Sequence, residues 1–239
     1  MTAAGVSTLL ERVAVVTGAS RGVGAAIAVT LADQGAVVVA VSRSGRVPDG
    51  AGASVHAIAA DLSVDDDIGR LCDTVAERFG QVSIIVHSAG LFGSGPTASA
   101  SVTDLDDLLR VNLRAPYILT KRLLQDVTAT RGDVVFIGSA TAGRATVGQY
   151  AATKAGLSAF ADSLREEMNP VGVRVTTIQL GRTATDMQRA VHRTEGRPFD
   201  PDVMIQPMDV AATVAYAVTL PHSAQLADVR LLPLRRVGG

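Results

Sequence analysis

Tyr150 and Lys154 are the two residues whose types and spacing are best suited to chemistry. They lie one helical turn apart in a helical pattern, so both side chains project from the same face. A free phenol has a pKa of about 10, too high for efficient proton transfer at neutral pH, but a nearby ammonium favours the phenolate and lowers that pKa. The pair therefore predicts a tyrosine that exchanges a proton with a substrate. Such pairs also occur by chance on many helices, so the interpretation depends on the surrounding elements.

A glycine-rich turn supplies that context. Gly18, Gly22 and Gly24 follow a predicted strand and precede a small, apolar helix. Glycines let the backbone turn tightly and approach a pyrophosphate closely, and the first amides of the helix face its negative charge. This position in an α/β pattern predicts a dinucleotide site. The same turn contains Ser20, Arg21 and Val23.

The end of the second predicted strand indicates which dinucleotide binds. Folds that select NAD usually place an acid there for the ribose 2′-hydroxyl, whereas this chain has Ser42 and Arg43. Arg43 can pair with a 2′-phosphate and Arg21 can reach the same region, so the two cations favour NADP(H) over NAD(H). The alternative is that both are solvated surface arginines. After the third strand, Asp61 and Leu62 stand where an adenine amino group could bind, although an ordinary strand-end acid would look the same.

These candidate residues must be positioned by a sheet. Short β-rich apolar runs alternate with longer helical patterns, which is typical of βαβ units. Seven strands are predicted, at residues 13–17, 36–41, 55–60, 83–87, 133–137, 173–179 and 229–232. The middle strands are near-continuous runs of Val and Ile, so helices must cover both faces. The fold class is therefore α/β, a Rossmann-like, doubly wound, parallel seven-stranded sheet with helices on both faces.

The helices follow from capping and breaking signals. After the glycine turn, they are predicted at residues 25–34 and at about residues 63–79, 103–128 and 150–169. Ser63 and Thr103 are expected to act as N-caps, and Pro116 to kink its helix. No shift in composition marks a second domain, so residues 1–239 are expected to form one. The long irregular stretch at residues 183–207 is expected to be a substrate lid.

Composition and charge limit the partners. The sequence has 22 Lys and Arg against 23 Asp and Glu, a net charge of −1, which provides no basic field for nucleic acid or anionic membranes. No apolar segment is long enough to span a bilayer, and the first residues lack the basic region of a secretory signal. Cys72 is the only cysteine, and the histidines show no metal-ligand spacing. We therefore expect no disulfide, no metal and a cytoplasmic location.

Together, these motifs resemble those of the short-chain dehydrogenase/reductase family. The family's TGxxxGxG motif stands at residues 17–24, its acidic pair at Asp61 and Leu62, its active-site asparagine at Asn112 and its YxxxK motif at residues 150–154. The resemblance extends to two further blocks. The NNAG block corresponds to residues 87–90, which include Ala89 and Gly90, and the PGxxxT segment to residues 180–185, which include Gly181, Thr183 and Thr185.

The resemblance implies a role for each matched residue. Tyr150 would protonate a carbonyl oxygen as hydride arrives from the cofactor, or take a hydroxyl proton in the reverse direction. Lys154 would hold the nicotinamide ribose and lower the pKa of Tyr150. Ser139 would orient the substrate oxygen. Asn112 would hold a water that links Lys154 to solvent, and Thr185 would lie near the nicotinamide carboxamide.

Three positions depart from the family pattern. His87 replaces the first asparagine of the NNAG block and is expected to be structural. Leu180 replaces the proline of PGxxxT. Ser139 lies closer to Tyr150 in sequence than the family spacing, which leaves Thr141 as an alternative source of the hydrogen bond to the substrate. Ser139 is favoured because it follows the apolar run at the end of the fifth strand.

The sequence thus predicts an NADP(H)-dependent oxidoreductase that transfers hydride between nicotinamide and a ketone, an aldehyde or a secondary alcohol. The alternative is a non-catalytic NADP-binding sensor or assembly subunit on the same fold. The substrate is expected to be a small carbonyl compound or alcohol in a pocket lined by the lid with Leu91, Phe92 and Val147. The resemblance also implies a homodimer or homotetramer.

Overall fold

The computed structural model describes residues 9–140 and 145–235. Within this part of the chain one parallel sheet has the strand order β3-β2-β1-β4-β5-β6-β7. Its strands are β1 (Val13–Thr17), β2 (Val37–Ser42), β3 (Val55–Ala59), β4 (Val82–His87), β5 (Asp133–Ser139), β6 (Arg174–Leu180) and β7 (Asp228–Leu231). The strand order reverses direction between β1 and β4, so the sheet is doubly wound and the predicted fold class is confirmed.

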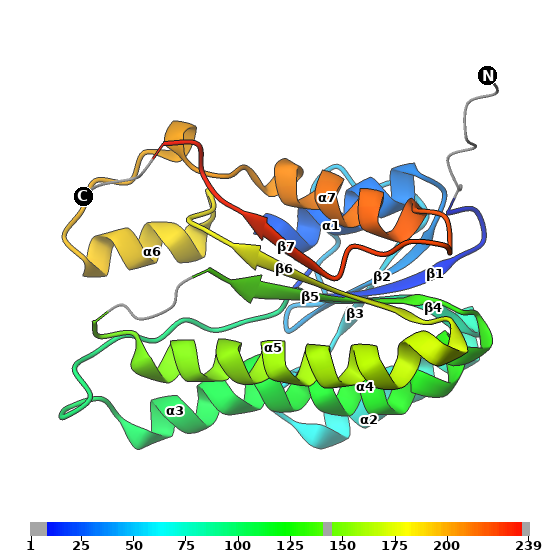
Figure 1. Cartoon of the computed structure of the whole chain (residues 1–239), viewed down its shortest axis with the longest axis horizontal. Helices are drawn as coiled ribbons and strands as arrows, with labels where there is room; N and C mark the ends of the chain where they lie inside the picture. The colour runs from blue at the N-terminus through cyan, green and yellow to red at the C-terminus, as the bar shows by residue number, and fades with distance from the viewer. Residues whose placement is uncertain (1–8, 141–144, 236–239) are drawn as a thin grey trace.

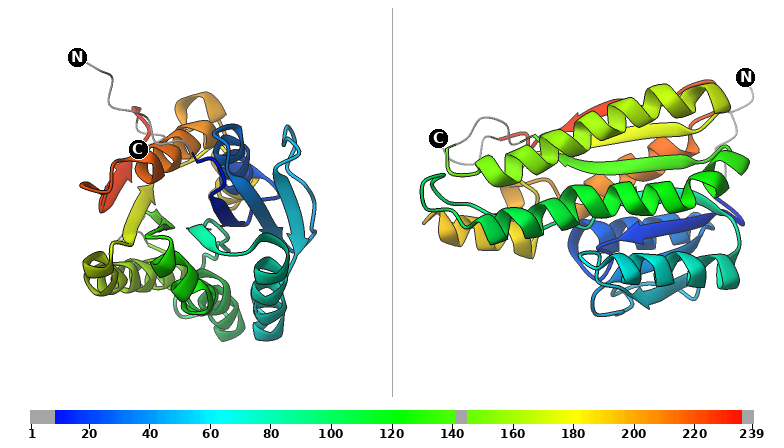
Figure 2. Two further views of the ribbon diagram at one scale, coloured as in Figure 1. Left: turned by 90° about the vertical axis from the view of Figure 1, so that its right-hand side faces the viewer. Right: turned by 90° about the horizontal axis from the view of Figure 1, so that it is seen from below.

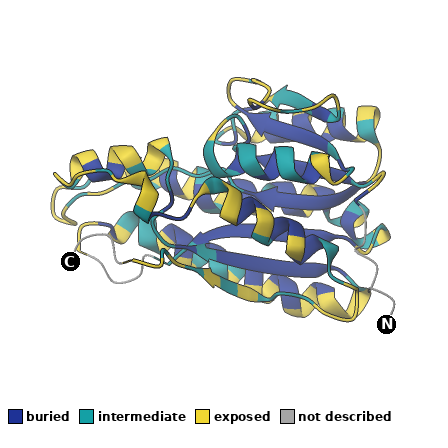
Figure 3. Ribbon diagram, turned by 90° about the horizontal axis from the view of Figure 1, so that it is seen from above, coloured by how far each residue is buried: buried dark blue, intermediate teal, exposed yellow. Residues whose placement is uncertain are grey.

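Helices cover both faces of this sheet, as the Val- and Ile-rich strands require (Figures 1 and 2). One face carries α2 (Asp65–Phe79), α4 (Ala115–Ala129) and α5 (Gly148–Met168), and the other carries α1 (Gly22–Asp33) and α7 (Pro207–Thr219). Figure 3 shows the result, with buried strands between helices whose outward faces are exposed. The carboxyl ends of the strands point toward α3 (Val102–Leu109) and α6 (Asp186–Thr194), which lie at one end of the molecule (Figure 1).

The single helix predicted at residues 103–128 is wrong in detail. It consists of α3, a π-helical turn at Arg110–Arg114, and α4. Pro116 lies in the first turn of α4, where a missing backbone N–H is tolerated, so the irregularity precedes the proline as a π turn. Ser101, not Thr103, caps α3, because its hydroxyl accepts from the backbone N–H groups of Thr103 and Asp104.

The cap predicted for α2 is also wrong. Val64 occupies the N-cap position without a side-chain bond, while the Ser63 hydroxyl donates to Asp61 over 2.7 Å. The stretch at residues 183–207 is not irregular throughout. It contains α6 and a 3-10 turn at Pro201–Val203. A separate 3-10 turn, at Asn169–Val171, follows α5. Thr185 caps α6 by accepting from the Gln188 N–H over 3.2 Å.

An arginine pair holds the amino edge of the sheet. The Asp133 carboxylate, at the start of β5, accepts from Arg12 over 2.7 Å and from Arg174 over 2.7 Å and 3.2 Å. Both guanidinium groups also donate to the carbonyl of Val218 in the last turn of α7. This edge is therefore a satisfied, buried ion cluster that joins β5, β6 and α7.

Candidate active site

The glycine turn brings β1 into close contact with the end of β4. A Cβ on Gly18 would lie 2.8 Å from the Cα of Ala89, and one on Gly24 would lie 2.4 Å from the carbonyl oxygen of Gly18. Gly18 and Gly22 also have positive φ angles, of 68° and 60°. Only glycine meets these requirements at low cost. Arg21, at the N-cap of α1, makes no side-chain capping bond, so the first amides of the helix are available to an anion.

A cavity of about 720 Å³ lies at the carboxyl edge of the sheet. Its walls include every residue that the sequence predicts to bind the cofactor: Gly18, Ser20, Arg21, Gly22, Val23, Gly24, Ser42, Arg43, Asp61, Leu62, Ala89, Gly90, Tyr150, Lys154, Gly181, Thr183 and Thr185. Tyr150 and Lys154 lie on α5, and the other residues come from the ends of β1, β2, β3, β4 and β6 and the segments that follow them, which is where doubly wound folds bind ligands.

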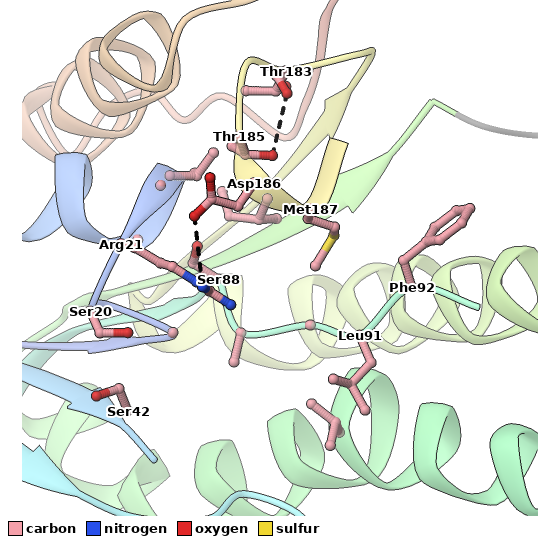
Figure 4. A pocket seen from close by; sticks show the side chains of 18 of the residues that line it. Ser20, Arg21, Ser42, Ser88, Leu91, Phe92, Thr183, Thr185, Asp186 and Met187 are labelled. Atoms are coloured by element: carbon pink, nitrogen blue, oxygen red, sulfur yellow. Dashed lines mark hydrogen bonds and ion pairs between the residues drawn. The ribbon is translucent and has the colours of Figure 1, made fainter. Parts of the chain in front are cut away.

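One end of the cavity carries the predicted selectivity residues. Ser42 and Arg43 line it beside Arg46, a further cation that the sequence reasoning missed. The Asp61 carboxylate accepts hydrogen bonds from the Ser63 side chain and backbone, and these bonds lower its pKa. At the mouth, Arg21 forms an ion pair with Asp186 over 3.7 Å, between the glycine turn and the first turn of α6 (Figure 4).

Tyr150 and Lys154 lie at the other end of the cavity, on α5, together with Ser139 from the end of β5. Burial raises the pKa of the Tyr150 phenol, and a side-chain hydrogen bond with Ser139 opposes that effect. Burial also lowers the pKa of Lys154 to about 8. The sequence predicts a lowered pKa for Tyr150, whereas the net direction here is upward because burial is the largest effect. The alternative hydroxyl, Thr141, lies outside the described residues.

The Lys154 ammonium is held by the sheet. Its Nζ donates to the carbonyl of Ile137 over 3.0 Å, and the residue is 9% exposed. No carboxylate of a described residue lies within ion-pair distance of it. The ammonium is therefore a buried cation that keeps its charge without a counterion from this part of the chain.

Asn112 lies behind the cavity wall and does not line it. Its side chain accepts from the Leu91 N–H over 2.8 Å and donates to the Leu91 carbonyl over 3.0 Å and to the Thr153 hydroxyl over 3.1 Å. This residue is fully buried. These hydrogen bonds join the π turn to the loop after β4. The predicted role of Asn112 in holding a water stays a prediction.

His87 is buried under the same site. Its Nε2 lies 2.8 Å from the Thr120 hydroxyl, and its ring stacks on Phe136 with centroids 4.8 Å apart. Burial and the charge of Lys154 lower the His87 pKa to about 3. A histidine that stays neutral and joins β4 to α4 fits the structural role expected from the sequence.

Some wall residues were not singled out from the sequence: Arg46, Asp107, Val111 and Arg182. Met187, Gln188 and Val191 also line the cavity, as expected for the predicted lid at residues 183–207. These three residues belong to α6. The sequence features that could have predicted this helix are the threonine cap, an acidic residue in its first turn and two basic residues in its last turn. Val147 is buried and is not among the wall residues. Leu91 and Phe92 line the cavity as expected.

Residues 9–140 and 145–235 contain neither a membrane-spanning helix nor a metal-binding cluster. No helix in these ranges is long and apolar enough to cross a membrane. No group of three or more His, Cys, Asp or Glu side chains there is arranged to hold a metal ion.

The fold and the cavity define a dinucleotide-binding α/β protein, and comparison with known proteins identifies the family. The short chain dehydrogenase family profile matches residues 12–196. An uncharacterized oxidoreductase of Staphylococcus epidermidis is 31% identical over 231 residues, covering 94% of this chain and 98% of its own. The protein thus belongs to the short-chain dehydrogenase family and is an oxidoreductase.

Solved structures of similar proteins belong to the same family. A metagenomic short-chain oxidoreductase in complex with NADP has a TM-score of 0.81 and 31% identity, covering 96% of this chain and 100% of its own. A short chain dehydrogenase from Burkholderia cenocepacia in complex with NADP has a TM-score of 0.79 and 29% identity, covering 93% and 97%.

Proposed function

We propose that the protein is an NADP(H)-dependent oxidoreductase that transfers hydride between nicotinamide and a ketone, an aldehyde or a secondary alcohol. The observation that carries the proposal is the convergence of Tyr150, Ser139 and Lys154 on the cavity that the glycine turn opens. The glycine turn fits a dinucleotide, because a side chain at Gly18 would collide with the backbone of Ala89, one at Gly24 would collide with Gly18, and the turn leads into the N-terminus of α1. When bound, the cofactor supplies or accepts the hydride.

Tyr150 is the proposed general acid/base. Burial keeps the phenol protonated at neutral pH, so it holds the proton that a carbonyl oxygen needs during reduction. In this proposal Ser139, which shares a hydrogen bond with the phenol, donates to the same oxygen and orients it. Lys154 holds positive charge beneath the site, which stabilises the tyrosinate that forms when the proton leaves.

The preference for NADP(H) is also a proposal. Arg43 and Arg46 line the cavity, Arg21 lies at its mouth, and no acid follows β2 at the position that would bind a ribose 2′-hydroxyl. Guanidinium groups suit a 2′-phosphate because they are planar and permanently charged. The NADP complexes of the two similar structures support the same choice.

The test is oxidation of NADPH, followed by its absorbance, with a panel of ketones and aldehydes. We expect turnover by the native protein and a loss of about 10²- to 10⁴-fold for Tyr150→Phe. Tyr216→Phe is the matched control, since Tyr216 is 60% exposed on α7 and lies outside the cavity. Turnover that survives Tyr150→Phe would refute the mechanism.

A non-catalytic NADP sensor or assembly subunit is the second candidate. Its supporting observation is the histidine at position 87, which departs from the family pattern and whose pKa is lowered in part by the charge of Lys154. Tight NADPH binding with no turnover across the panel would favour this candidate over the reductase.

A further inference from the structure

The cavity wall beside Tyr150 is apolar. The Phe92 ring lies 5.0 Å from the Tyr150 ring, centroid to centroid, at an interplanar angle of 56°. Leu91 lines the same wall one residue earlier. A substituent of a carbonyl group that receives the Tyr150 proton must therefore pass close to an aromatic ring and a leucine.

Helix α6 provides a second apolar wall. Met187 and Val191 both line the cavity and lie one helical turn apart, so they share a face of α6. Val111, from the π turn, also lines the cavity. Figure 4 shows Leu91, Phe92 and Met187 together, away from Ser20 and Ser42. Met187 is 43% exposed, and a flexible, polarizable side chain in that position adapts to an apolar ligand.

The charged side chains of this part of the wall already form ion pairs with other side chains. Arg182 donates through Nη2 to Glu195 over 2.6 Å, and its Nη1 is buried without a hydrogen-bond partner among the described residues. Asp107 pairs with Arg110 over 3.3 Å. Lys154 lies beneath the site and is assigned to the catalytic chemistry. A substrate carboxylate at this wall would therefore be desolvated without a new cationic partner from the described residues.

The first wall is held in place before any ligand arrives. Both backbone polar groups of Leu91 are bonded to the Asn112 side chain, and farther along the loop Gly95 donates to the carbonyl of Thr146 over 2.7 Å. Such preorganisation lets the wall select its ligand by shape and polarity.

We propose that the substrate is an uncharged ketone or aldehyde whose larger substituent is apolar and lies between Phe92 and Leu91 on one side and Met187 and Val191 on the other. This inference rests on the proposed function, because it uses Tyr150 as the reacting acid. The cavity also receives the dinucleotide in the proposed function, so the substituent occupies the part of the cavity next to Tyr150.

The test compares matched carbonyl compounds with saturating NADPH. In the series 2-butanone, 2-pentanone and 2-hexanone, kcat/KM should rise about fourfold per methylene as each is buried. Replacing the terminal methyl of 2-hexanone by a carboxylate gives 5-oxohexanoate, for which kcat/KM should fall about tenfold or more. Benzaldehyde and 4-carboxybenzaldehyde form an aromatic pair with the same expectation.

A charge placed on α6 should reverse the preference. Met187→Lys is expected to lower kcat/KM for 2-hexanone and raise it for 5-oxohexanoate, with both compounds compared at saturating NADPH so that a change in cofactor affinity does not contribute. Met208→Lys is the control, since Met208 is 58% exposed on α7, away from the cavity.

The outcomes separate this inference from the proposed function. Equal or better turnover of the carboxylates by the native protein, or the same response in both lysine variants, overturns the apolar site and leaves the reductase standing. Tight NADPH binding with no turnover of any compound in either series overturns the reductase and the inference with it.

Discussion

The two edges of the sheet treat buried charge differently. At the amino edge, Asp133 is bound by Arg12 and Arg174, and the remaining guanidinium hydrogens reach carbonyls such as that of Val218. At the carboxyl edge, Lys154 is buried to a similar degree but donates only to the carbonyl of Ile137 among the described residues. At the first edge each buried charged group has a partner of opposite charge, whereas at the second edge the ammonium has no carboxylate partner among the described residues.

This difference separates groups that stabilise the fold from groups that are prepared to react. A buried, paired carboxylate needs its partners and contributes no chemistry. A buried ammonium carries an energetic cost in the folded state at neutral pH, and together with a buried phenol whose pKa is also shifted it is suited to proton transfer. Stability and activity are therefore expected to respond to different edges of one sheet.

The largest effect on stability is expected from the amino edge. Asp133→Ala leaves two guanidinium groups without their carboxylate, so the free energy of unfolding should fall by about 3–5 kcal/mol. Denaturant titration measures the change. Asp162→Ala is the control, because Asp162 pairs with Arg165 while remaining 60% exposed, and should cost about 1 kcal/mol or less. Equal losses in both variants would contradict the contrast between the edges.

At the carboxyl edge, Lys154→Met is expected to increase stability while abolishing turnover. Burial lowers the Lys154 pKa from 10.5 to about 8, so at pH 7 the folded state bears the cost of a desolvated cation, and its removal should stabilise by about 1–3 kcal/mol.

The pH dependence of that gain has a definite sign. Between pH 8 and 10.5 the unfolded lysine still binds a proton that the folded one has lost, so wild-type stability rises with pH and the advantage of Lys154→Met narrows. Unfolding measured at pH 7 and pH 10 tests this, with Lys121→Met, at an exposed position, as the control. A variant less stable than wild type at pH 7 would argue that Lys154 is a structural residue.

At the cofactor end of the carboxyl edge, Arg43→Asp should weaken NADPH binding by about 10- to 100-fold. This factor corresponds to the free energy of a hydrogen bond between charged groups. NADH lacks the 2′-phosphate, so its affinity should change much less. Fluorescence titration with both dinucleotides measures the ratio, with Arg70→Asp, exposed and outside the cavity, as the control. Equal weakening of both dinucleotides would show that Arg43 does not select the phosphate.

The smallest effect is expected from the ion pair at the cavity mouth. Arg21 and Asp186 are 74% and 69% exposed, so Asp186→Asn should change the free energy of unfolding by less than about 1 kcal/mol. The Kd for NADPH should fall, by less than about fivefold, since Arg21 is released and a negative charge is lost beside the phosphates. Weaker NADPH binding would show that the pair supports the site.

Much of this architecture could be predicted because its signals are local. Short apolar runs bounded by glycines and other turn residues indicate the strands. The ends of each predicted strand lie within two residues of the ends of an observed strand. The π turn before Pro116 and helix α6 could not be placed in the same way. The sequence of residues 183–207 mixes charged and apolar residues as a loop does. Helix α6 became evident from the structure, where Thr185 caps its start and Arg182 pairs with Glu195 just after its end.

The glycine spacing and the helical interval from Tyr150 to Lys154 could be read directly from residue types, because both depend on backbone geometry over a few positions. The pKa shifts and the long-range ion pairs depend instead on how the folded chain packs. Whether the Tyr150 pKa rises or falls depends on how much water the surrounding helices exclude, and the partners of Asp133 come from segments far apart in the chain. Desolvation and long-range pairing arise from the folded arrangement of the whole chain, so they became visible only in three dimensions.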